Sequence, residues 1–570
     1  MLIFICCFLL LVHTVGSLVS IGIDVGTGSA RAGVVDVSTG RLLATRKQAI
    51  TTWSPLPEYY QQSSNEIWDA CANCVRGALK DAGIDASSVV GVGFDATCSL
   101  VCLDADQHPI GTDPTAPDES EQNVILWMDH RATPQADIIN AMGHERLSTV
   151  GGTISPEMEV PKMSWLRENM PDAFSRANSG KFLDLADYLA YRATDYTSDV
   201  RSLCTIVCKW AYDARADGTG LGWDRSFLRA VGFADDELLP SCIGDVVQAP
   251  GTAIEGGIGS LAASELGVPA GTPLAVGMID AHAGGIGCLG IKLPEDPPLT
   301  GRLALIAGTS TCHMASTREP KFVSGVWGPY YSAMVPSLYL NEGGQSAAGA
   351  LIDHVIESHA AFTELKGAAE AHGESNVAFL NRRLSDLAKQ QGKAVAMLAA
   401  DLHVTPDYAG NRSPLADPRM RGVIVGLGLT ATLDDLAIQY LATVQALAYQ
   451  TRAIVEALAY DDPPITAVIA CGGLSKNPLF MQTHADVLRL PIHTAQQEEA
   501  VLLGAAILGA AAGGAHASIE LAMANMNAIG ETVWPIAAVE TYHEKKYTVF
   551  HKMNAAQADY RNIMAEADQS

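Results

Sequence analysis

The fold is decided by two similar stretches, SIGIDVGTGSARAGVVD at residues 20–36 and LALIAGTSTCHMAS at residues 303–316. Each stretch predicts a β-strand, a tight Gly-Thr turn and a second β-strand. In each turn, glycine lets the backbone come close to a ligand, and a hydroxyl side chain follows at once. Two such hairpins, about 280 residues apart, predict a duplicated domain. If they face each other across a cleft, they could hold one triphosphate from both sides.

Length and composition agree with two α/β domains. A chain of 570 residues is too long for one compact core, so two domains of roughly 250 residues are expected. With 48% hydrophobic residues, 18% charged residues and 52 glycines, the composition is typical of an α/β enzyme rich in tight turns. Prolines and acids interrupt the pattern at 291–300, where we place the domain junction. The predicted division is 1–17 (apolar extension or signal), 18–292 (first domain), 293–552 (second domain) and 553–570 (tail).

Charge and cysteine usage narrow the class of protein. The net charge of −26 argues against a nucleic-acid partner, because no stretch gathers enough Lys or Arg to release counterions from phosphates. The 12 cysteines lack the spacing of a zinc site and the density of a disulfide scaffold, which favours free thiols in a reducing compartment. Cys71 and Cys74 form a C-x-x-C, but they lie in an apolar-periodic run. We therefore interpret them as one buried face of a helix.

The first 17 residues, MLIFICCFLLLVHTVGS, bear on localisation. An apolar run followed by small residues resembles a secretory signal, and it is too short to span a bilayer. The absence of a basic n-region, the free thiols and a first strand beginning near Leu18 favour the cytoplasm. A cleaved signal, which would make the protein secretory, and an atypical start codon both stay open. We expect no membrane partner.

The second half of the chain contains a long helix and a βαβ unit. The helix is expected at 433–458, where Thr432 and Asp435 form a capping-box start. Further on, a strand at 465–470 precedes the turn of Gly472 and Gly473, a helix at 478–490 and a strand at 491–494. The N-terminus of such a helix presents free N–H groups and a positive dipole end. This unit therefore suits a phosphate or nucleotide.

The first hairpin combines groups that suit a metal and a phosphate. Asp24, Gly26, Thr27 and Arg31 place a carboxylate, a glycine bend, a hydroxyl and a guanidinium around one turn. Taken alone, this pattern is equally well a surface hairpin. The presence of Gly308-Thr309-Ser310 and then of the two glycines at 472–473, in that order, favours nucleotide binding.

Asp280 is the strongest candidate for a catalytic group. It is a lone carboxylate within the otherwise uncharged stretch 274–291, and burying it without a purpose would be costly. Transfer of a phosphoryl group to a hydroxyl needs a base that accepts the proton as the O–P bond forms. A carboxylate within hydrogen-bond reach usually provides that base.

Together the three glycine-rich sites resemble the two phosphate motifs and the adenosine motif of the FGGY carbohydrate kinases, members of the actin and hexokinase fold group. The resemblance covers nearly all of 20–552. It extends to five further segments: GFDATCSLV at 93–101, WMDHR at 127–131, CKW at 208–210, GMIDAHAGG at 277–285 and NEGGQS at 341–346. The first of these segments ends in TCSLV, and this ending resembles the corresponding segment of the D-ribulokinase branch of the family.

The resemblance implies an α/β fold of two actin-like (ribonuclease H-like) domains with an interdomain nucleotide cleft. It implies phosphorylation of D-ribulose to D-ribulose 5-phosphate, with Mg-ATP held by both hairpins and Asp24 reaching the Mg²⁺ through water. The nucleoside end would lie at Gly472, Gly473 and Asn477. The open-chain ketose would lie in the first domain, which is the sugar-binding one, and Asp280 would be the base. The implied sugar contacts are Ala96, Lys209, Asp280 and Glu342.

Simpler interpretations stay open for several of these residues. The segment at 127–131 could be only a helix start with Asp129 near the dipole. Lys209 could pair with any acid, Glu342 could be a turn residue, and His282 is interpreted as a packing residue.

Other functions also stay open. The same chemistry could act on L-ribulose, xylulose or ribitol, because such sugars differ in only a few hydrogen bonds. A non-catalytic actin-like nucleotide-binding protein is the alternative from another class. A homodimer is possible, but the sequence does not establish the oligomeric state.

Overall fold

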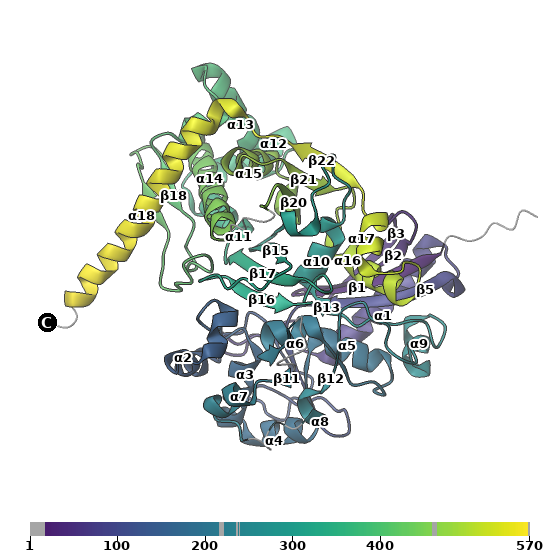
Figure 1. Ribbon diagram of the computed structural model, residues 1–570. Helices are drawn as coiled ribbons and strands as arrows, with labels where there is room; N and C mark the ends of the chain where they lie inside the picture. Colours follow the sequence, from purple (N-terminus) through teal and green to yellow (C-terminus); the bar gives the residue numbers. More distant parts are fainter. Residues whose placement is uncertain (1–17, 216–221, 235–237, 239, 459–463, 568–570) are drawn as a thin grey trace, which may run out of the picture.

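The computed structural model describes residues 18–215, 222–234, 238, 240–458 and 464–567. The extension or signal predicted at 1–17 lies outside these residues. The chain forms two α/β lobes, one from its purple and blue first half and one from its green second half (Figure 1). Helices α10 and α16 lie between the two lobes.

The first lobe is built on a five-stranded sheet in the order β13-β5-β1-β2-β3. Strand β1 pairs antiparallel with β2 and parallel with β5, and the hairpin predicted at 20–36 is β1 and β2. The strands are β1 (Val19–Gly26), β2 (Ser29–Asp36), β3 (Leu42–Ala49), β5 (Val89–Ala96) and β13 (Met278–Ile279).

The second lobe repeats this arrangement. Its seven-stranded sheet has the order β16-β17-β15-β14-β20-β21-β22, and the second predicted hairpin is β14 and β15. In both sheets an antiparallel strand flanks the hairpin on one side: β3 in the first sheet and β17 in the second. Two parallel strands flank it on the other side: β5 and β13 in the first sheet, and β20 and β21 in the second. The strands are β14 (Arg302–Ala307), β15 (Thr311–Thr317), β16 (Trp327–Tyr331), β17 (Tyr339–Gln345), β20 (Ala467–Cys471), β21 (Ile492–Ala495) and β22 (Ile529–Val533).

This shared strand order is that of two ribonuclease H-like domains, as in actin. The duplicated domain expected from the two hairpins and the fold class implied by the family resemblance are therefore confirmed. Smaller strand groups complete the lobes: a sheet of β4 (Gln61–Gln62), β7 (Val124–Ile125), β6 (Leu100–Leu103) and β8 (Lys181–Asp184), and the pairs β9 (Val200–Ser202) with β12 (Val246–Gln248), β10 (Tyr212–Asp213) with β11 (Gly222–Trp223), and β18 (His403–Thr405) with β19 (Val423–Val425).

The helices follow the predicted pattern closely. Cys71 and Cys74 are buried free thiols on α1, and Thr432 and Asp435 form a capping box at the start of α14. In the first half of the chain the helices are α1 (Ser64–Ala82), α2 (Thr133–Ala141), α3 (Glu159–Asn169), α4 (Pro171–Ser179), α5 (Leu185–Ala193), α6 (Leu203–Lys209), α7 (Arg225–Val231), α8 (Pro240–Ile243), α9 (Ser260–Leu266) and α10 (Asp280–Leu289). In the second half they are α11 (Gly349–Ser358), α12 (Phe362–His372), α13 (Asn376–Gln391), α14 (Leu433–Ala457), α15 (Pro478–Leu488), α16 (Ala500–Ala512), α17 (Ile519–Met526) and α18 (Glu540–Ala567).

The packing of α16 differs from the predicted division of the chain. This helix lies in sequence between β21 and β22 of the second sheet, but it packs against β1, β5 and α10 of the first lobe. Close approach is possible because glycines line the contact: a Cβ added to Gly93 would lie 2.1 Å from the Ala505 carbonyl oxygen. A boundary at 292/293 thus separates segments that share one core.

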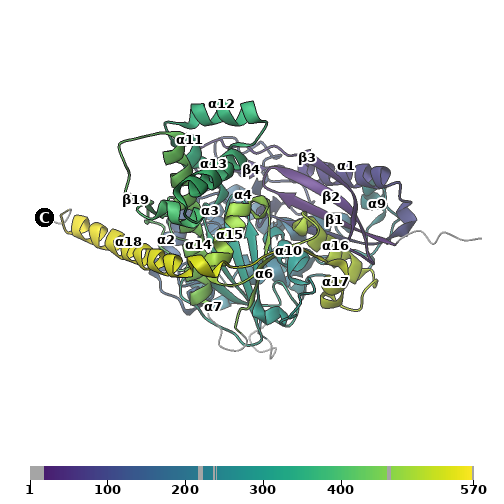
Figure 2. The ribbon, with the colours of Figure 1, turned by 90° about the horizontal axis from the view of Figure 1, so that it is seen from above.

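The tail predicted at 553–570 also has regular structure over its described residues. Helix α18 continues without a break across the predicted boundary between residues 552 and 553, and it projects beyond the second lobe (Figure 2). None of the helices in the described part of the chain combines the length and the apolar character that a bilayer-spanning segment requires.

The contact between α10 and α16 yields a stability prediction. A Cβ added to Gly504 would lie 2.0 Å from the Ala283 carbonyl oxygen, so Gly504→Ala must push the two helices apart. We expect the variant to lose about 1–3 kcal/mol of unfolding free energy, measured by thermal or urea unfolding. Gly367→Ala is the matched control, because Gly367 lies within α12 with no atom near its added Cβ. It should be neutral or gain up to about 1 kcal/mol, and equal effects of the two changes would contradict this account.

Candidate active site

The first hairpin presents a buried carboxylate and a guanidinium as a cross-strand pair. Asp24 on β1 is opposite Arg31 on β2, and their Oδ2 and Nη2 atoms lie 2.6 Å apart. Asp24 is fully buried, whereas Arg31 is about one-third exposed and also reaches Glu499 at 3.1 Å. Burial raises the pKa of Asp24 to about 7, against the opposing charge of Arg31.

Thr27, at the turn of this hairpin, is held by the segment at 127–131. The indole Nε1 of Trp127 donates to the Thr27 hydroxyl oxygen at 3.0 Å, which leaves the Thr27 O–H free to donate to a phosphate. In the same segment, Asp129 and Arg131 form a buried bidentate ion pair with nitrogen–oxygen distances of 2.7 and 2.8 Å. The segment is therefore a structural support for the turn.

The second hairpin and the glycine pair lie side by side, because β14 pairs with β20. Thr309 is exposed at the turn, and its carbonyl oxygen accepts the amides of Ala348 and Ala350 near the start of α11. Gly472 adopts a φ of +91°, and an added Cβ would lie 2.5 Å from the Ala307 carbonyl oxygen. Only glycine fits at position 472. At the next residue, Gly473, an added Cβ would meet no atom within 4 Å.

Two neighbouring acids connect the first hairpin to the glycine turn. Glu499 pairs with Arg31, and Glu498 pairs with Lys476, three residues after Gly473. Segments that are far apart in sequence therefore converge, as the predicted nucleotide motifs require.

Asn477 has a more local task than the sequence suggested. Its side-chain oxygen caps α15 by accepting the Leu479 amide, and its nitrogen donates to the Tyr440 hydroxyl at 2.8 Å. Asn381 also donates to Asn477 at 3.0 Å. Through these bonds the side chain of Asn477 shapes the turn.

Three carboxylates lie at the carboxyl ends of the three neighbouring parallel strands β1, β5 and β13 of the first sheet. Asp24 on β1 is in register with Asp95 on β5, and Asp280 begins α10 directly after β13. Asp95 is fully buried, and neither of its oxygens has a hydrogen-bond partner among the described residues. Burial, and then the charges of Asp24 and Asp280, raise the pKa of Asp95 well above its usual range. Ionisation of Asp95 is thus disfavoured beside Asp24.

Asp280 lies next to the predicted sugar contact Ala96, because Ile279 and Ala96 are register partners. It is half-buried, and its Oδ1 accepts the Ala281 amide at 2.7 Å. Burial raises the pKa of Asp280, against this hydrogen bond and the charge of His282. A raised pKa brings a carboxylate closer to the basicity that a proton acceptor needs.

Lys209 and Glu342 face each other across the interface of the two lobes. Lys209, at the end of α6, is 5% exposed, and its Nζ lies 4.4 Å from the ring centre of Trp327 on β16. Glu342 on β17 contacts the Nη2 of Arg412 and the Nε2 of His282, both at 3.3 Å. Burial opposes ionisation, but the hydrogen bond from His282 and the charge of Arg412 lower the pKa of Glu342 to about 2. Glu342 is therefore a carboxylate.

The four predicted sugar contacts do not all belong to the first domain, where they were expected. Glu342 belongs to the second sheet, whereas Ala96, Lys209 and Asp280 belong to the first lobe. The four predicted sugar contacts therefore come from both lobes. The error arose because the motif around Glu342 was assigned by resemblance, without a position in the sheet.

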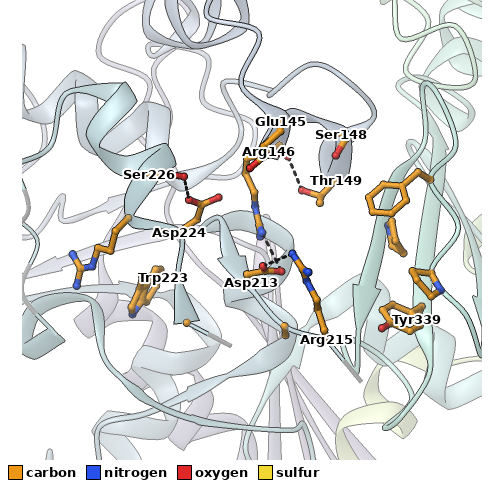
Figure 3. Close-up of a pocket in the computed structure, with 16 residues that line it drawn as sticks. Glu145, Arg146, Ser148, Thr149, Asp213, Arg215, Trp223, Asp224, Ser226 and Tyr339 are labelled. Carbon is orange, nitrogen blue, oxygen red and sulfur yellow. Dashed lines mark hydrogen bonds and ion pairs between the residues drawn. The ribbon is translucent and has the colours of Figure 1, made fainter. Parts of the chain in front are cut away.

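A separate polar cavity of about 660 Å³ lies outside this cluster (Figure 3). Two of its arginines, Arg146 and Arg215, contact Asp213 at 3.4 and 3.1 Å, and the third, Arg225, donates to the Leu238 carbonyl oxygen at 2.9 Å. Among the described residues that line it, none belongs to the predicted sugar or nucleotide set. It is therefore distinct from the candidate active site.

Comparison with known proteins places this site in a family. Residues 19–287 match the N-terminal domain, and residues 303–513 the C-terminal domain, of the FGGY family of carbohydrate kinases. The chain belongs to the FGGY family of carbohydrate kinases. The FGGY membership expected from the glycine-rich motifs is thereby confirmed.

Individual FGGY relatives match over nearly the whole chain. An FGGY carbohydrate kinase domain-containing protein of Xenopus laevis is 47% identical over 551 residues, covering 95% of this chain and 98% of that protein. A D-ribulokinase of Saccharomyces cerevisiae is 39% identical over 520 residues, covering 86% of this chain and 71% of that protein. Among solved structures, a xylulose kinase from Lactobacillus acidophilus aligns with a TM-score of 0.76 at 19% identity, covering 95% of this chain and 98% of that one.

Sequence reasoning missed three members of this FGGY kinase site: Asp95, Trp327 and Arg412. Asp95 did carry a signal, since it is a charged residue within the apolar strand at 89–96. Arg412 lies in a loop rich in Gly, Pro and Asp with no recognisable pattern. Only the fold brings it to Glu342.

Proposed function

We propose that this carbohydrate kinase phosphorylates D-ribulose to D-ribulose 5-phosphate at the expense of ATP. The observation that carries the proposal is the 39% identity to a D-ribulokinase over 520 residues. The segment TCSLV at 97–101 supports it, because this segment follows Ala96 directly and lies near Lys209, whose charge acts on Cys98. The substrate would thus be bound beside the feature that resembles the D-ribulokinase branch.

In the proposed reaction, the terminal hydroxyl of the open-chain ketose attacks the γ-phosphate of ATP. Asp280 accepts the hydroxyl proton as the new O–P bond forms. Lys209 and Glu342 donate and accept hydrogen bonds with the remaining hydroxyls. The Thr27 and Thr309 turns hold the phosphates, and closure of the lobes excludes water and so suppresses hydrolysis of ATP.

The chain's residues fit a Mg²⁺ ion in this cleft. Oxygen ligands on carboxylates suit Mg²⁺, which usually keeps several waters, and the Asp24 Oδ1 atom has no partner among the described residues. Bound through water at Asp24, Mg²⁺ would neutralise the developing charge on the phosphates.

A substrate panel tests the proposed function. ADP release is measured with D-ribulose, L-ribulose, xylulose and ribitol, each at several concentrations, with ATP and Mg²⁺. We expect the highest kcat/KM for D-ribulose. A higher kcat/KM for another member would move the substrate assignment to that sugar. If every sugar left the rate of ADP release unchanged, the alternative of a nucleotide-binding protein without sugar kinase activity would be favoured.

Removal of the charge of Lys209 should weaken sugar binding. Lys209→Met keeps most of the apolar part of the side chain, but it removes the charge that lies over the Trp327 ring and cannot donate to a sugar hydroxyl. Because hydrogen bonds to charged groups contribute about 1.5–3 kcal/mol, we expect the KM for the ketose to rise roughly 10- to 100-fold, with the KM for ATP little changed. Glu342→Gln should also raise the KM for the ketose and leave the KM for ATP little changed.

The matched control for this experiment is Lys162→Met. Lys162 is also buried, but it pairs with Glu159 on α3, and the change should lower stability without altering the KM for the ketose. A raised KM for ATP with an unchanged sugar KM would remove Lys209 and Glu342 from the sugar pocket.

A further inference from the structure

A buried row of polar contacts continues from Glu342 into the interior of the first lobe. The Nε2 atom of His282 lies 3.3 Å from Glu342 Oε2, and its Nδ1 atom lies 2.9 Å from the Sγ atom of Cys204. His282 is 1% exposed and Cys204 is fully buried. On the outer side, Glu342 Oε1 faces Arg412. A thiol, an imidazole, a carboxylate and a guanidinium are thus aligned from the core to the pocket.

This row joins the elements that carry the predicted sugar contacts. Cys204 lies on α6, whose last residue is Lys209. His282 lies on α10, two residues after Asp280. Glu342 lies on β17 of the other sheet. A change at Cys204 can therefore reach the pocket through a single intervening side chain.

The four side chains of the row can carry charges of alternating sign: thiolate, imidazolium, carboxylate and guanidinium. Burial opposes ionisation of the thiol, but hydrogen bonds with Cys208 and His282 lower the pKa of Cys204 to about 6. Burial likewise opposes protonation of the imidazole, but Cys204 and Glu342 raise the pKa of His282 to about 10. The Ile279 amide also donates to the sulfur at 3.4 Å. Each buried charge thus has partners of opposite sign on its neighbours, which is the condition for tolerating it.

We propose that Cys204 is a positioning residue for sugar binding: its thiolate holds His282 as an imidazolium, and this cation fixes the Glu342 carboxylate in the orientation that receives the sugar hydroxyls. The role rests on the proposed sugar contact of Glu342. With Oε2 on His282 and Oε1 on Arg412, the carboxylate cannot rotate freely. Its remaining lone pairs are then presented to the ligand in one fixed arrangement.

A neutral thiol that donates to a neutral imidazole would satisfy the same distances. In that case serine could replace Cys204 without loss, because a hydroxyl donates equally well. The neutral pair and the thiolate–imidazolium pair differ in the charge of the sulfur, which can be measured. The thiol of Cys312 on β15 also donates to Glu342 Oε1, at 3.6 Å. The other titratable groups that act electrostatically on this row are Cys208, Asp184, Asp280, Lys209, Tyr330, Glu157 and Cys98.

The first experiment measures thiolate absorbance in the ultraviolet as a function of pH, on native full-length protein. The proposal expects a thiolate that persists down to about pH 6 in wild type and is lost in Cys204→Ser. The matched control is Cys74→Ser, because Cys74 is also a buried cysteine but lies on α1, away from this row. The Cys74→Ser variant should retain the thiolate. Absence of this thiolate from native wild-type protein at about pH 7 would overturn the proposal, whatever the variants do.

The second experiment compares the steady-state kinetics of the same variants on the sugar that the wild type prefers. A serine hydroxyl stays neutral, so in Cys204→Ser the imidazolium loses its anion and Glu342 is held less firmly. We expect the sugar KM to rise about tenfold, with kcat and the KM for ATP unchanged, while Cys74→Ser matches wild type. An unchanged sugar KM in Cys204→Ser would overturn the positioning role.

A third variant separates charge from packing. Cys204→Asp restores an anion beside His282 and should bring the sugar KM back toward the wild-type value, which a packing defect would not allow. If instead the wild type phosphorylates no sugar at all, the proposed function fails, and the thiolate titration still decides the charge state of Cys204.

Discussion

Asp280→Asn should turn over D-ribulose about 10²- to 10⁴-fold more slowly than wild type, because general base catalysis typically contributes that factor. An amide has nearly the shape of a carboxylate, and its oxygen can still accept the Ala281 amide that Asp280 now accepts. It cannot take the proton of the sugar hydroxyl. The loss should therefore appear in kcat, with nucleotide affinity little changed.

The measurement is steady-state ADP release by Asp280→Asn, together with ATP binding and thermal unfolding of the same preparation. Turnover near the wild-type rate would contradict the assignment and leave Asp280 as a group that only orients a hydroxyl. A variant that unfolds at a much lower temperature would identify a structural carboxylate instead, since Asp280 begins α10 at the contact of the two lobes.

The second large effect is expected at Asp24. Asp24→Asn removes the anion that pairs with Arg31 and that faces the proposed Mg²⁺ site. Groups that hold a metal through an intervening ligand typically change its affinity about 10- to 100-fold when altered. The Mg²⁺ concentration that half-saturates turnover should therefore rise by about that factor, as measured by titration at saturating ATP.

Asp95→Asn is the matched control for Asp24→Asn. Asp95 lies beside Asp24 in the same register and is equally buried, but burial and the charge of Asp24 raise its pKa well above the usual range, which favours its acid form. An amide can donate as that acid does, so the dependence on Mg²⁺ should change little. An equal loss in both variants would show that Asp95 also meets the metal as an anion.

Sequence alone determined the elements that depend on local contacts. The Gly-Thr hairpins at 20–36 and 303–316 specify their own strands and turns, because alternation and glycine act over a few residues. The repetition of the hairpin was enough to predict a duplicated α/β fold, which β1 with β2 and β14 with β15 confirm. Asp280 was recognisable as a candidate for the same reason, since an isolated charge in an apolar stretch is a local signal.

Only the tertiary structure decided which distant residues share an environment. Helix α16 joins the first lobe, Arg412 reaches Glu342, and Cys204 meets His282 through contacts between segments at least 70 residues apart. Such contacts are set by the packing of whole elements, and they leave no periodic pattern in the chain. The charge state of a buried group follows from the same neighbours, because burial and nearby charges shift its pKa. For that reason the electrostatic surroundings of Asp95 and Cys204 follow from the folded chain and not from its local sequence.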